Sequence, residues 1–288
     1  MFEFEPLVRL SWFLAAAAPS SVTPEAALPA PVFPSVWESI EAPVIPVHPA
    51  LTDTWWFGLG TTFLNSNTQA ELSGAGGAGA VIDFEDAFGL AENKWAPQAL
   101  ARWRFSERWR LEFEYFSLNR SNSKTTENDV TWGDTTIPAG TDVKGTFDTT
   151  VLRVSCGYSF FKTQDKELGV ALGFHVTEFE AGLEATGFST KDGKVLAPLP
   201  VISMYGQFGL TDEWAVQGRL DVLRIQSDPF YGNILSIGVD ALWQPWRHLG
   251  FGAGWRTLQV SGGVSSSDWE GQITTDYTGP ILFVSSSF

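Results

Sequence analysis

The segment from Arg102 to Phe116, RWRFSERWRLEFEYF, alternates apolar and charged side chains on both sides of a short polar break. Alternation in period two is typical of a β-strand with two unlike faces, and the break predicts a hairpin turn. One face carries tryptophan, phenylalanine, leucine and tyrosine, whereas the other carries arginine and glutamate. Such a hairpin suits either a soluble sheet lying on a core or the wall of a transmembrane barrel.

The composition excludes several classes of protein. The mean hydropathy is -0.01, and no apolar run approaches the ~20 residues that a membrane helix needs, which excludes a helical membrane protein. A barrel escapes this test, because the lumen-facing half of each strand dilutes the lipid-facing half. The net charge of -15 argues against nucleic acid as a partner. The single cysteine, Cys156, excludes an internal disulfide.

The same alternation recurs along the chain. It predicts a strand over 55–63, hairpins of 149–161 with 168–180, 201–210 with 214–225 and 234–244 with 249–260, and a last strand over 277–288. Together with the first hairpin these give ten strands, although eight or twelve are also compatible with the pattern. The sequence thus predicts an all-β fold, a closed antiparallel transmembrane β-barrel over 53–288, with a soluble β-sandwich or lipocalin-like binder as the rival.

The links between the predicted strands alternate in length and carry the acidic charge. Short turns alternate with long links at 66–95, 119–148, 178–197 and 262–276, with the short link at 226–231 as the exception. The four long links hold more than half of the 33 acidic residues but only a third of the 18 basic ones. Outer-membrane barrels have tight periplasmic turns and extended outer loops. The pattern therefore predicts that this chain lies in the outer membrane of a Gram-negative bacterium. The acidic links could continue as β-structure above the membrane.

The first 52 residues are of a different kind. Residues 1–18 contain an apolar stretch that ends in small residues, as in a secretory signal, although Glu3 and Glu5 stand where positive charge is expected. Residues 19–52 are rich in proline, which favours extended conformations, and predict a periplasmic linker. Whether residues 1–18 are cleaved is left open.

A final strand that closes on Phe288 resembles the assembly signal of bacterial outer-membrane barrels, with Ser286 as a departure from it. With DFEDAFGL at 83–90 and WGDTTIPAGT at 132–141, the region from Asp53 onward is similar to small OmpA/OmpW-like outer-membrane β-barrel proteins, a group without assigned activity. The resemblance implies a fold, a location and recognition of Phe288 by the barrel-assembly machinery. It implies no reaction.

The residues predicted to face the lumen form an ionic network. A narrow lumen excludes bulk water, so charged groups there must pair to remain ionised. Paired charges would make a salt-bridged plug, whereas the excess of arginine leaves an anion-preferring constriction, and hence a narrow solute channel, as the alternative. The predicted network comprises Arg102, Arg104, Arg110, Glu112, Glu114, Arg153, His175, Arg219, Asp221, Asp240 and Arg256.

Candidates for other chemistry are few. His175 is the one histidine placed on a predicted strand, and a lipid hydrolase of the outer leaflet would need such a base, but no spacing marks a nucleophile near it. Asp83, Glu85 and Asp86 form an acidic group whose oxygens could hold Ca²⁺ or Mg²⁺. The spacing of a calcium-binding loop is missing, however, and acidic side chains exposed to water are the simpler interpretation.

We therefore expect a non-enzymatic barrel without a cofactor, serving envelope structure, surface interaction or anchoring. Its expected partners are outer-membrane lipid and lipopolysaccharide, the assembly machinery, and a periplasmic or surface protein.

Overall fold

The computed structural model describes residues 47–74, 80–127, 129–132, 135–185, 191–227, 230–265 and 269–288. The predicted signal, most of the proline-rich linker, the glycine-rich run at 75–79 and the loop residue Asp134 lie outside the described residues. The described residues from 47 to 288 belong to one compact unit.

Long β-strands make up nearly all of this unit, together with two short helices. The elements are α1 (Pro49–Thr52), β1 (Trp55–Gly74), β2 (Ala80–Asp83), α2 (Phe84–Phe88), β3 (Asn93–Arg104), β4 (Trp109–Thr125), β5 (Val130–Trp132), β6 (Thr135–Ile137), β7 (Asp142–Lys162), β8 (Lys166–Ala185), β9 (Lys191–Gly209), β10 (Trp214–Ser227), β11 (Phe230–Trp246), β12 (Leu249–Ser265) and β13 (Trp269–Ser287). Among the described residues, no helix has the length and apolar character to cross a membrane.

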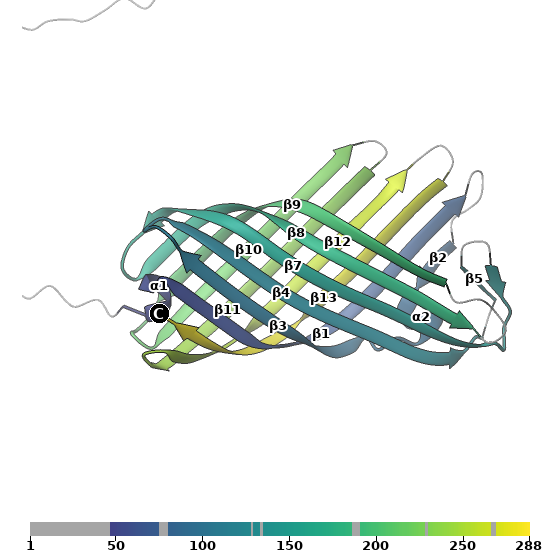
Figure 1. Cartoon of the computed structure of the whole chain (residues 1–288), viewed down its shortest axis with the longest axis horizontal. Coiled ribbons are helices and arrows are strands. Elements are labelled where there is room, and N and C mark those ends of the chain that lie inside the picture. The colour runs from purple at the N-terminus through teal and green to yellow at the C-terminus, as the bar shows by residue number, and fades with distance from the viewer. Residues whose placement is uncertain are drawn as a thin grey trace, which may run out of the picture. The chain divides into compact units, whose positions relative to one another are not determined.

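The strands close into an antiparallel barrel (Figure 1). Each barrel strand pairs with its neighbour in chain order, and β13 pairs with β1 to complete the ring, with Trp56 opposite Ser287. The strand β2 pairs only with β1, and β5 and β6 form a separate small hairpin, so ten strands build the wall. The predicted fold class and the count of ten strands are both confirmed.

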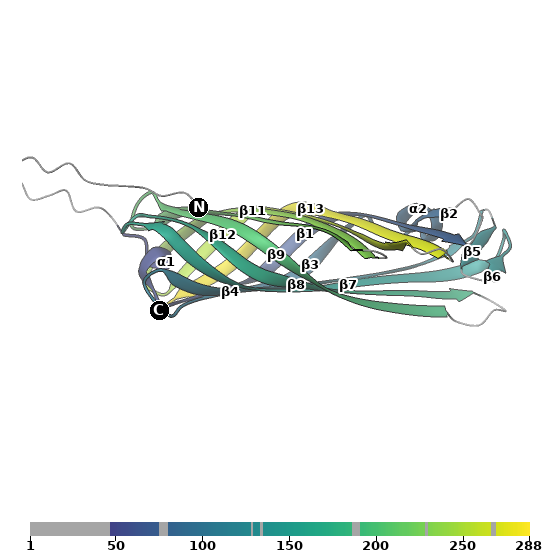
Figure 2. The same ribbon diagram turned by 90° about the horizontal axis from the view of Figure 1, so that it is seen from above.

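The two ends of the barrel differ. Short turns join β3 to β4, β7 to β8, β9 to β10 and β11 to β12 at the end where α1 and the C-terminal residue lie, which we call the turn end (Figure 1). The helix α2 and the hairpin of β5 and β6 lie at the opposite loop end (Figure 2). Outer-membrane barrels place their short turns in the periplasm, which assigns the turn end to that side.

Near the turn end, the outside of the barrel is apolar. On β7 the outward residues Leu152, Val154, Cys156, Tyr158 and Phe160 alternate with buried inward ones. Neighbouring strands add residues such as Leu172, Phe174, Ile202, Met204, Trp243, Phe251 and Leu282, each more than a third exposed. These residues share the apolar face of the alternating strands. Together they form an apolar belt in what we call the membrane half.

Toward the loop end the same strands reverse their polarity. The outward residues of β7 from Asp142 to Thr150 are polar, while Val143, Phe147 and Val151 point inward and are buried. On β8 the outward residues change from Val176 to Glu178, Glu180 and Glu184. We call this part the outer extension. It accounts for much of the sequence predicted as long acidic links.

The interior is consequently layered. An apolar cluster that includes Leu51, Trp56, Leu242 and Phe283 fills the turn end, and a larger apolar cluster around Phe84, Phe88 and Phe147 fills the outer extension. In that larger cluster Phe88 lies where any side chain at Gly145 would be, since a Cβ there would come within 2.7 Å of it. Between the two apolar clusters lies a polar layer.

Candidate functional site

The polar layer is built from strands all around the wall. The hairpin of β3 and β4 supplies five charged residues, because alternation turns its charged face inward, and the other strands supply their partners across the lumen. We call this set the ionic layer. It consists of Arg102, Arg104, Arg110, Glu112, Glu114, Arg153, Glu167, His175, Arg219, Asp221, Asp240 and Arg256.

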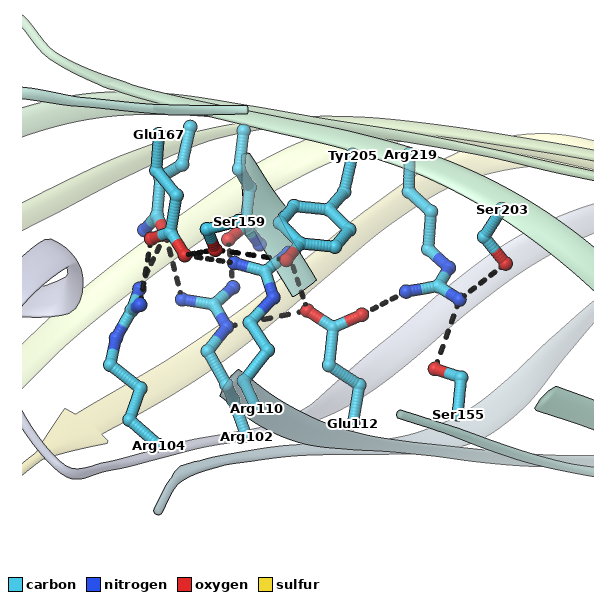
Figure 3. Close-up of polar contacts among 12 residues, drawn as sticks. Arg102, Arg104, Arg110, Glu112, Ser155, Ser159, Glu167, Ser203, Tyr205 and Arg219 are labelled. Atoms are coloured by element: carbon cyan, nitrogen blue, oxygen red, sulfur yellow. Dashed lines mark hydrogen bonds and ion pairs between the residues drawn. The ribbon is translucent and has the colours of Figure 1, made fainter. Parts of the chain in front are cut away.

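Glu112 stands at the centre of the ionic layer (Figure 3). Its carboxylate lies 2.9 Å from Arg110 Nη2 and 3.4 Å from Arg102 Nε, and it also pairs with Arg219 from the opposite wall. Arg153 Nη1 lies 3.7 Å away. One carboxylate thus receives four guanidinium groups, and it ties β4 to β3, β7 and β10.

Glu167 forms a second centre nearer the turn end. Arg104 Nη1 lies 2.7 Å from its carboxylate and Arg110 Nη1 lies 3.5 Å away. Ser159 donates to the same carboxylate and lies 2.9 Å from the Tyr205 hydroxyl. The guanidinium of Arg110 stacks on the Tyr205 ring, 3.3 Å from its centroid. Glu167 is therefore fully buried, and both of its carboxylate oxygens have partners.

The other side of the layer is paired in the same manner. Arg153 Nη2 lies 2.6 Å from Glu114, and Arg256 Nη1 lies 2.7 Å from Asp240. Asp221 accepts from Arg219 Nε at 2.6 Å and lies 3.3 Å from His175 Nε2. The layer therefore runs without a break from wall to wall.

Every residue of the predicted lumen network lies in this layer, and the structure adds Glu167. The sequence pattern began the strand at Leu168 and left Glu167 at the edge of the turn. A register shift between Tyr158 and Phe161 interrupts the alternation beside it. With Glu167 included, six arginines face five carboxylates, so most of the positive charge has an acid partner.

The helix α1 fills the mouth of the barrel at the turn end. The Ala50 carbonyl accepts from Arg102 Nη1 at 3.2 Å, Arg104 Nη2 at 3.2 Å and Gln207 Nε2 at 3.3 Å. Leu51 is fully buried in the apolar cluster beside it. This turn of helix lies in the stretch for which proline predicted extended conformations. Pro49 stands at its first position, where no N–H is needed.

His48 caps α1 and is itself buried. Its Nδ1 accepts a hydrogen bond from the Ala50 backbone N–H at 3.1 Å. Burial lowers the pKa of His48 below its ordinary value of 6.5, although Asp53 and Asp212 nearby act in the opposite direction. A neutral imidazole suits its role as an acceptor.

The acidic group at 83–86 has other partners in the outer extension. Asp83 caps α2 by accepting from the Asp86 N–H at 2.9 Å. Glu85 is buried, where it pairs with Arg120 and accepts from the Thr68 N–H at 2.9 Å. Within the described ranges, no three histidine, cysteine or acidic residues converge as a metal site would require. The predicted cation loop stays a prediction.

His175 lies within the ionic layer rather than at a surface. Its Nε2 faces Asp221, which also holds Arg219 and lies 3.7 Å from Arg153. In the described part of the chain, no hydroxyl or thiol hydrogen-bonds to His175. The arrangement supplies a positioned pair but no nucleophile.

Two small cavities lie among the described residues of the lumen. One cavity of about 70 Å³ lies among Trp56, Arg110, Glu112 and Arg219, and another of about 30 Å³ lies beside His175 and Tyr277. Each could hold a few water molecules. Neither forms a path for a solute.

Phe288 closes the seam of the barrel. Its backbone N–H donates to the Trp55 carbonyl at 2.9 Å, and its carbonyl accepts from Trp55 at 3.0 Å. Its ring is more than half exposed and stacks on His248 with centroids 5.0 Å apart. The side chain is therefore accessible beside the turn end, where its recognition during assembly is predicted.

Comparison with known proteins supports the fold. The outer membrane protease OmpT of Escherichia coli aligns over 85% of this chain and 99% of its own, with a TM-score of 0.53 and 10% sequence identity. Weaker likenesses include the transport unit of the autotransporter AIDA-I of Escherichia coli (TM-score 0.37, 10% identity, 82% of this chain and 90% of that one) and the Ail protein of Yersinia pestis (TM-score 0.33, 7% identity, 80% and 97%). No protein-family model matches the chain, and no curated protein sequence does either. The predicted resemblance is confirmed: the chain is an outer-membrane β-barrel.

Proposed function

We propose that this chain is a non-conducting, non-enzymatic barrel that serves the structure of the outer membrane and presents its outer extension as an interaction surface. The observation that carries the proposal is the closed lumen. The helix α1 blocks the turn end, the ionic layer fills the middle, and an apolar cluster fills the outer extension.

The ionic layer supports a plug rather than a channel. A conducting constriction needs charged groups that face water and release their ions. Here Glu112, Glu167 and Asp221 each hold two or more basic partners, and the Ala50 carbonyl covers the arginines on the turn side. Opening a path would separate buried ion pairs, and breaking one such pair costs about 3–5 kcal/mol.

The surroundings of His175 support a structural role. A hydrolase needs a hydroxyl within reach of the base and a substrate site beside it. Asp221 orients His175 inside a layer whose cavities hold only water-sized molecules. The protease activity named for OmpT belongs to that protein, and a likeness at 10% identity extends only its fold to this one.

The outer extension is the part suited to meet partners. It raises polar outward faces of β4, β7 and β8 above the membrane, with Glu178, Glu180 and Glu184 on β8. Lipid on the apolar belt and the assembly machinery at Phe288 complete the proposed partners.

A planar bilayer tests the closed lumen. Purified full-length protein is expected to show no steady conductance steps. A variant with Leu51→Asp and Glu112→Gln, which disrupts the apolar cluster at the turn end and the ionic layer, is expected to show brief, irregular conductance steps. Steady porin-like steps from the unaltered protein would overturn the proposal.

A second assay addresses the enzymatic alternative and the structural role. Outer-membrane lipids and fluorogenic peptides incubated with the protein are expected to remain intact by mass spectrometry. Cells that lack the protein are expected to admit more of a large hydrophobic dye, with the barrier restored by the unaltered gene and equally by its His175→Gln variant. Turnover that depends on His175 would replace the proposal with an enzyme.

A further inference from the structure

The larger of the two lumen cavities is surrounded by an uneven number of charges. Among the described residues, five arginines and four carboxylates line it, so the lining carries a net charge of +1 when every group is ionised. The remaining carboxylate of the ionic layer, Glu167, is matched by Arg104 at 2.7 Å. A buried charge without a counter-ion is costly, and the lipid around the membrane half offers none.

The unmatched positive charge lies beside Arg102 and Arg110. The other three arginines of the lining each lie 2.7 Å or less from a carboxylate. Arg102 and Arg110 both depend on Glu112, at 3.4 and 2.9 Å, and Glu112 also pairs with Arg219. Figure 3 shows these side chains meeting at that one carboxylate. The shortage of acid is therefore local to this part of the cavity.

Two buried N–H donors of the lining lack an acceptor among the described residues. They are Nε1 of Trp56 and Nε of Arg110, and both residues are 3% exposed. Buried donors in native proteins nearly always have an acceptor, either in the protein or in a bound molecule. Water in the cavity would satisfy these donors but would leave the positive charge unmatched. An anion satisfies both.

We infer that this cavity binds one small inorganic anion, a halide such as chloride, which accepts from Arg110 and Trp56. The cavity measures about 70 Å³ and holds a few water molecules, so a monatomic anion fits together with water. A lipid head group or a nucleotide is too large for it. The anion completes the charge balance of the ionic layer, and it lies where separate walls of the barrel meet.

This inference goes beyond the proposed function, which requires only that the lumen is closed. A barrel without conductance and without a bound halide would keep the proposed function and lose the inference. A barrel with steady conductance and a halide in this cavity would keep the inference and lose the proposed function.

Bromide locates the anion directly, because its anomalous scattering distinguishes it from water. Crystals of the full-length protein are grown with sodium bromide as the source of halide. An anomalous peak is expected in the cavity, in contact with Arg110 or Trp56. The absence of a peak there would overturn the inference, whatever bromide binds at the surface.

Gly238 offers a way to supply the missing acid from the chain itself. It lines the cavity and stands between two arginines, opposite Arg219 on β10 and Arg256 on β12. A Cβ at this position would come within 2.9 Å of Arg256 Nη1, the end of a flexible side chain that can shift. Gly238→Asp therefore adds a carboxylate where the positive charge lies, and Gly238→Asn adds the same shape without charge.

The two variants should differ in bromide. The peak is expected to disappear in Gly238→Asp, whose carboxylate replaces the anion, and to remain in Gly238→Asn. A peak of equal height in both would contradict a site governed by charge. Both variants are first checked for closure by their shift on a gel before and after boiling, and the unaltered protein decides the inference if neither closes.

Chloride should also stabilise the folded barrel in solution. Urea unfolding in vesicles is followed while chloride replaces gluconate, which is too large for the cavity, at fixed ionic strength. Above the dissociation constant, each tenfold rise in chloride is expected to lower the unfolding equilibrium constant about tenfold for the unaltered protein and for Gly238→Asn. Gly238→Asp is expected not to respond. An equal response of the two variants, or none in the unaltered protein, would overturn the inference.

Discussion

The membrane half and the outer extension share their strands but have opposite polarity. On β7, Arg153 and Ser155 point inward in the membrane half while Leu152 and Val154 point outward, whereas six residues earlier Phe147 points inward and Lys144 outward. The period of two does not change. What changes is the medium outside, and on this stretch of β7 the polarity of the inward residues is its complement.

The comparison shows that two different forces hold one sheet closed. In the outer extension, water outside drives Phe147, Phe84 and Phe179 together, as in a soluble barrel. In the membrane half, lipid solvates the outward side chains, so the interior holds the wall through paired charges instead. Substitutions at matched positions of the two regions should therefore have different consequences.

The largest expected effect is in the ionic layer. Glu112→Gln leaves Arg102, Arg110 and Arg219 without their shared acid and is expected to lower the free energy of unfolding by about 3–5 kcal/mol. Urea titration of the barrel refolded into vesicles measures this. Glu178→Gln on the outward face of the extension removes an exposed ion pair with Lys194 and should change stability by less than about 1 kcal/mol. Equal losses would show that the two regions do not differ.

The apolar interior of the outer extension gives the next effect. Phe147 is buried against Phe84 with ring centroids 4.9 Å apart, and Phe147→Ala is expected to cost about 3 kcal/mol through the cavity it leaves. Phe147→Leu keeps most of the volume and should cost about 1 kcal/mol. The same urea titration applies. A negligible loss for Phe147→Ala would mean that the extension is held by its ladders alone.

A lysine scan along the outward face of β7 locates the boundary between the regions. Val154→Lys places a charge in the apolar belt and is expected to cost about 2 kcal/mol, whereas Thr146→Lys in the outer extension should be nearly neutral. Stability is compared in vesicles of fixed thickness. A stability loss for Thr150→Lys that lies between those of the other two variants would place the boundary at this residue. An equal loss for Thr146→Lys and Val154→Lys would contradict the difference between the two regions.

The smallest effect concerns pH and the turn end. Because the pKa of His48 is lowered in the folded barrel, its contribution is fully present above the ordinary value of 6.5 and is lost as the pH falls through the lowered one. Acidification should therefore loosen α1 and change the fluorescence of Trp56, which is buried beside it.

A variant without the titrating group provides the control for that prediction. His48→Asn can still cap α1 but does not titrate, so its fluorescence should stay constant over the same pH range. An unchanged response in His48→Asn would assign the loosening to another group.

The sequence predicted the faces of the barrel but not the contacts across it. Alternation alone places Arg219 and Glu112 inward, whereas their pairing depends on the number of strands and the width of the ring. Glu167 was not predicted to face the lumen, because a register shift near Tyr158 disturbs the alternation at the turn between β7 and β8.

The outer extension was harder to predict for a different reason. At the boundary on β7, between Thr150 and Leu152, the apolar residues change from inward positions before it to outward positions after it, so a single alternating pattern ends there. The sequence from 119 to 148 was accordingly assigned to a link, with β-structure above the membrane only as an option. The end of the ladder between β9 and β10 at Ile202 could not be predicted, because Pro198 and Pro200 indicate a missing donor but not which neighbouring strand lacks it.

The seam between β1 and β13 has a consequence for how the barrel forms. Trp56 meets Ser287, so the first strand of the wall gains its second neighbour only when the last one arrives. Until then both strands present open edges, and such edges invite pairing with other chains. Biogenesis must therefore shield two distant edges at once and bring them together in one late event, so the chain stays exposed to aggregation until the ring closes.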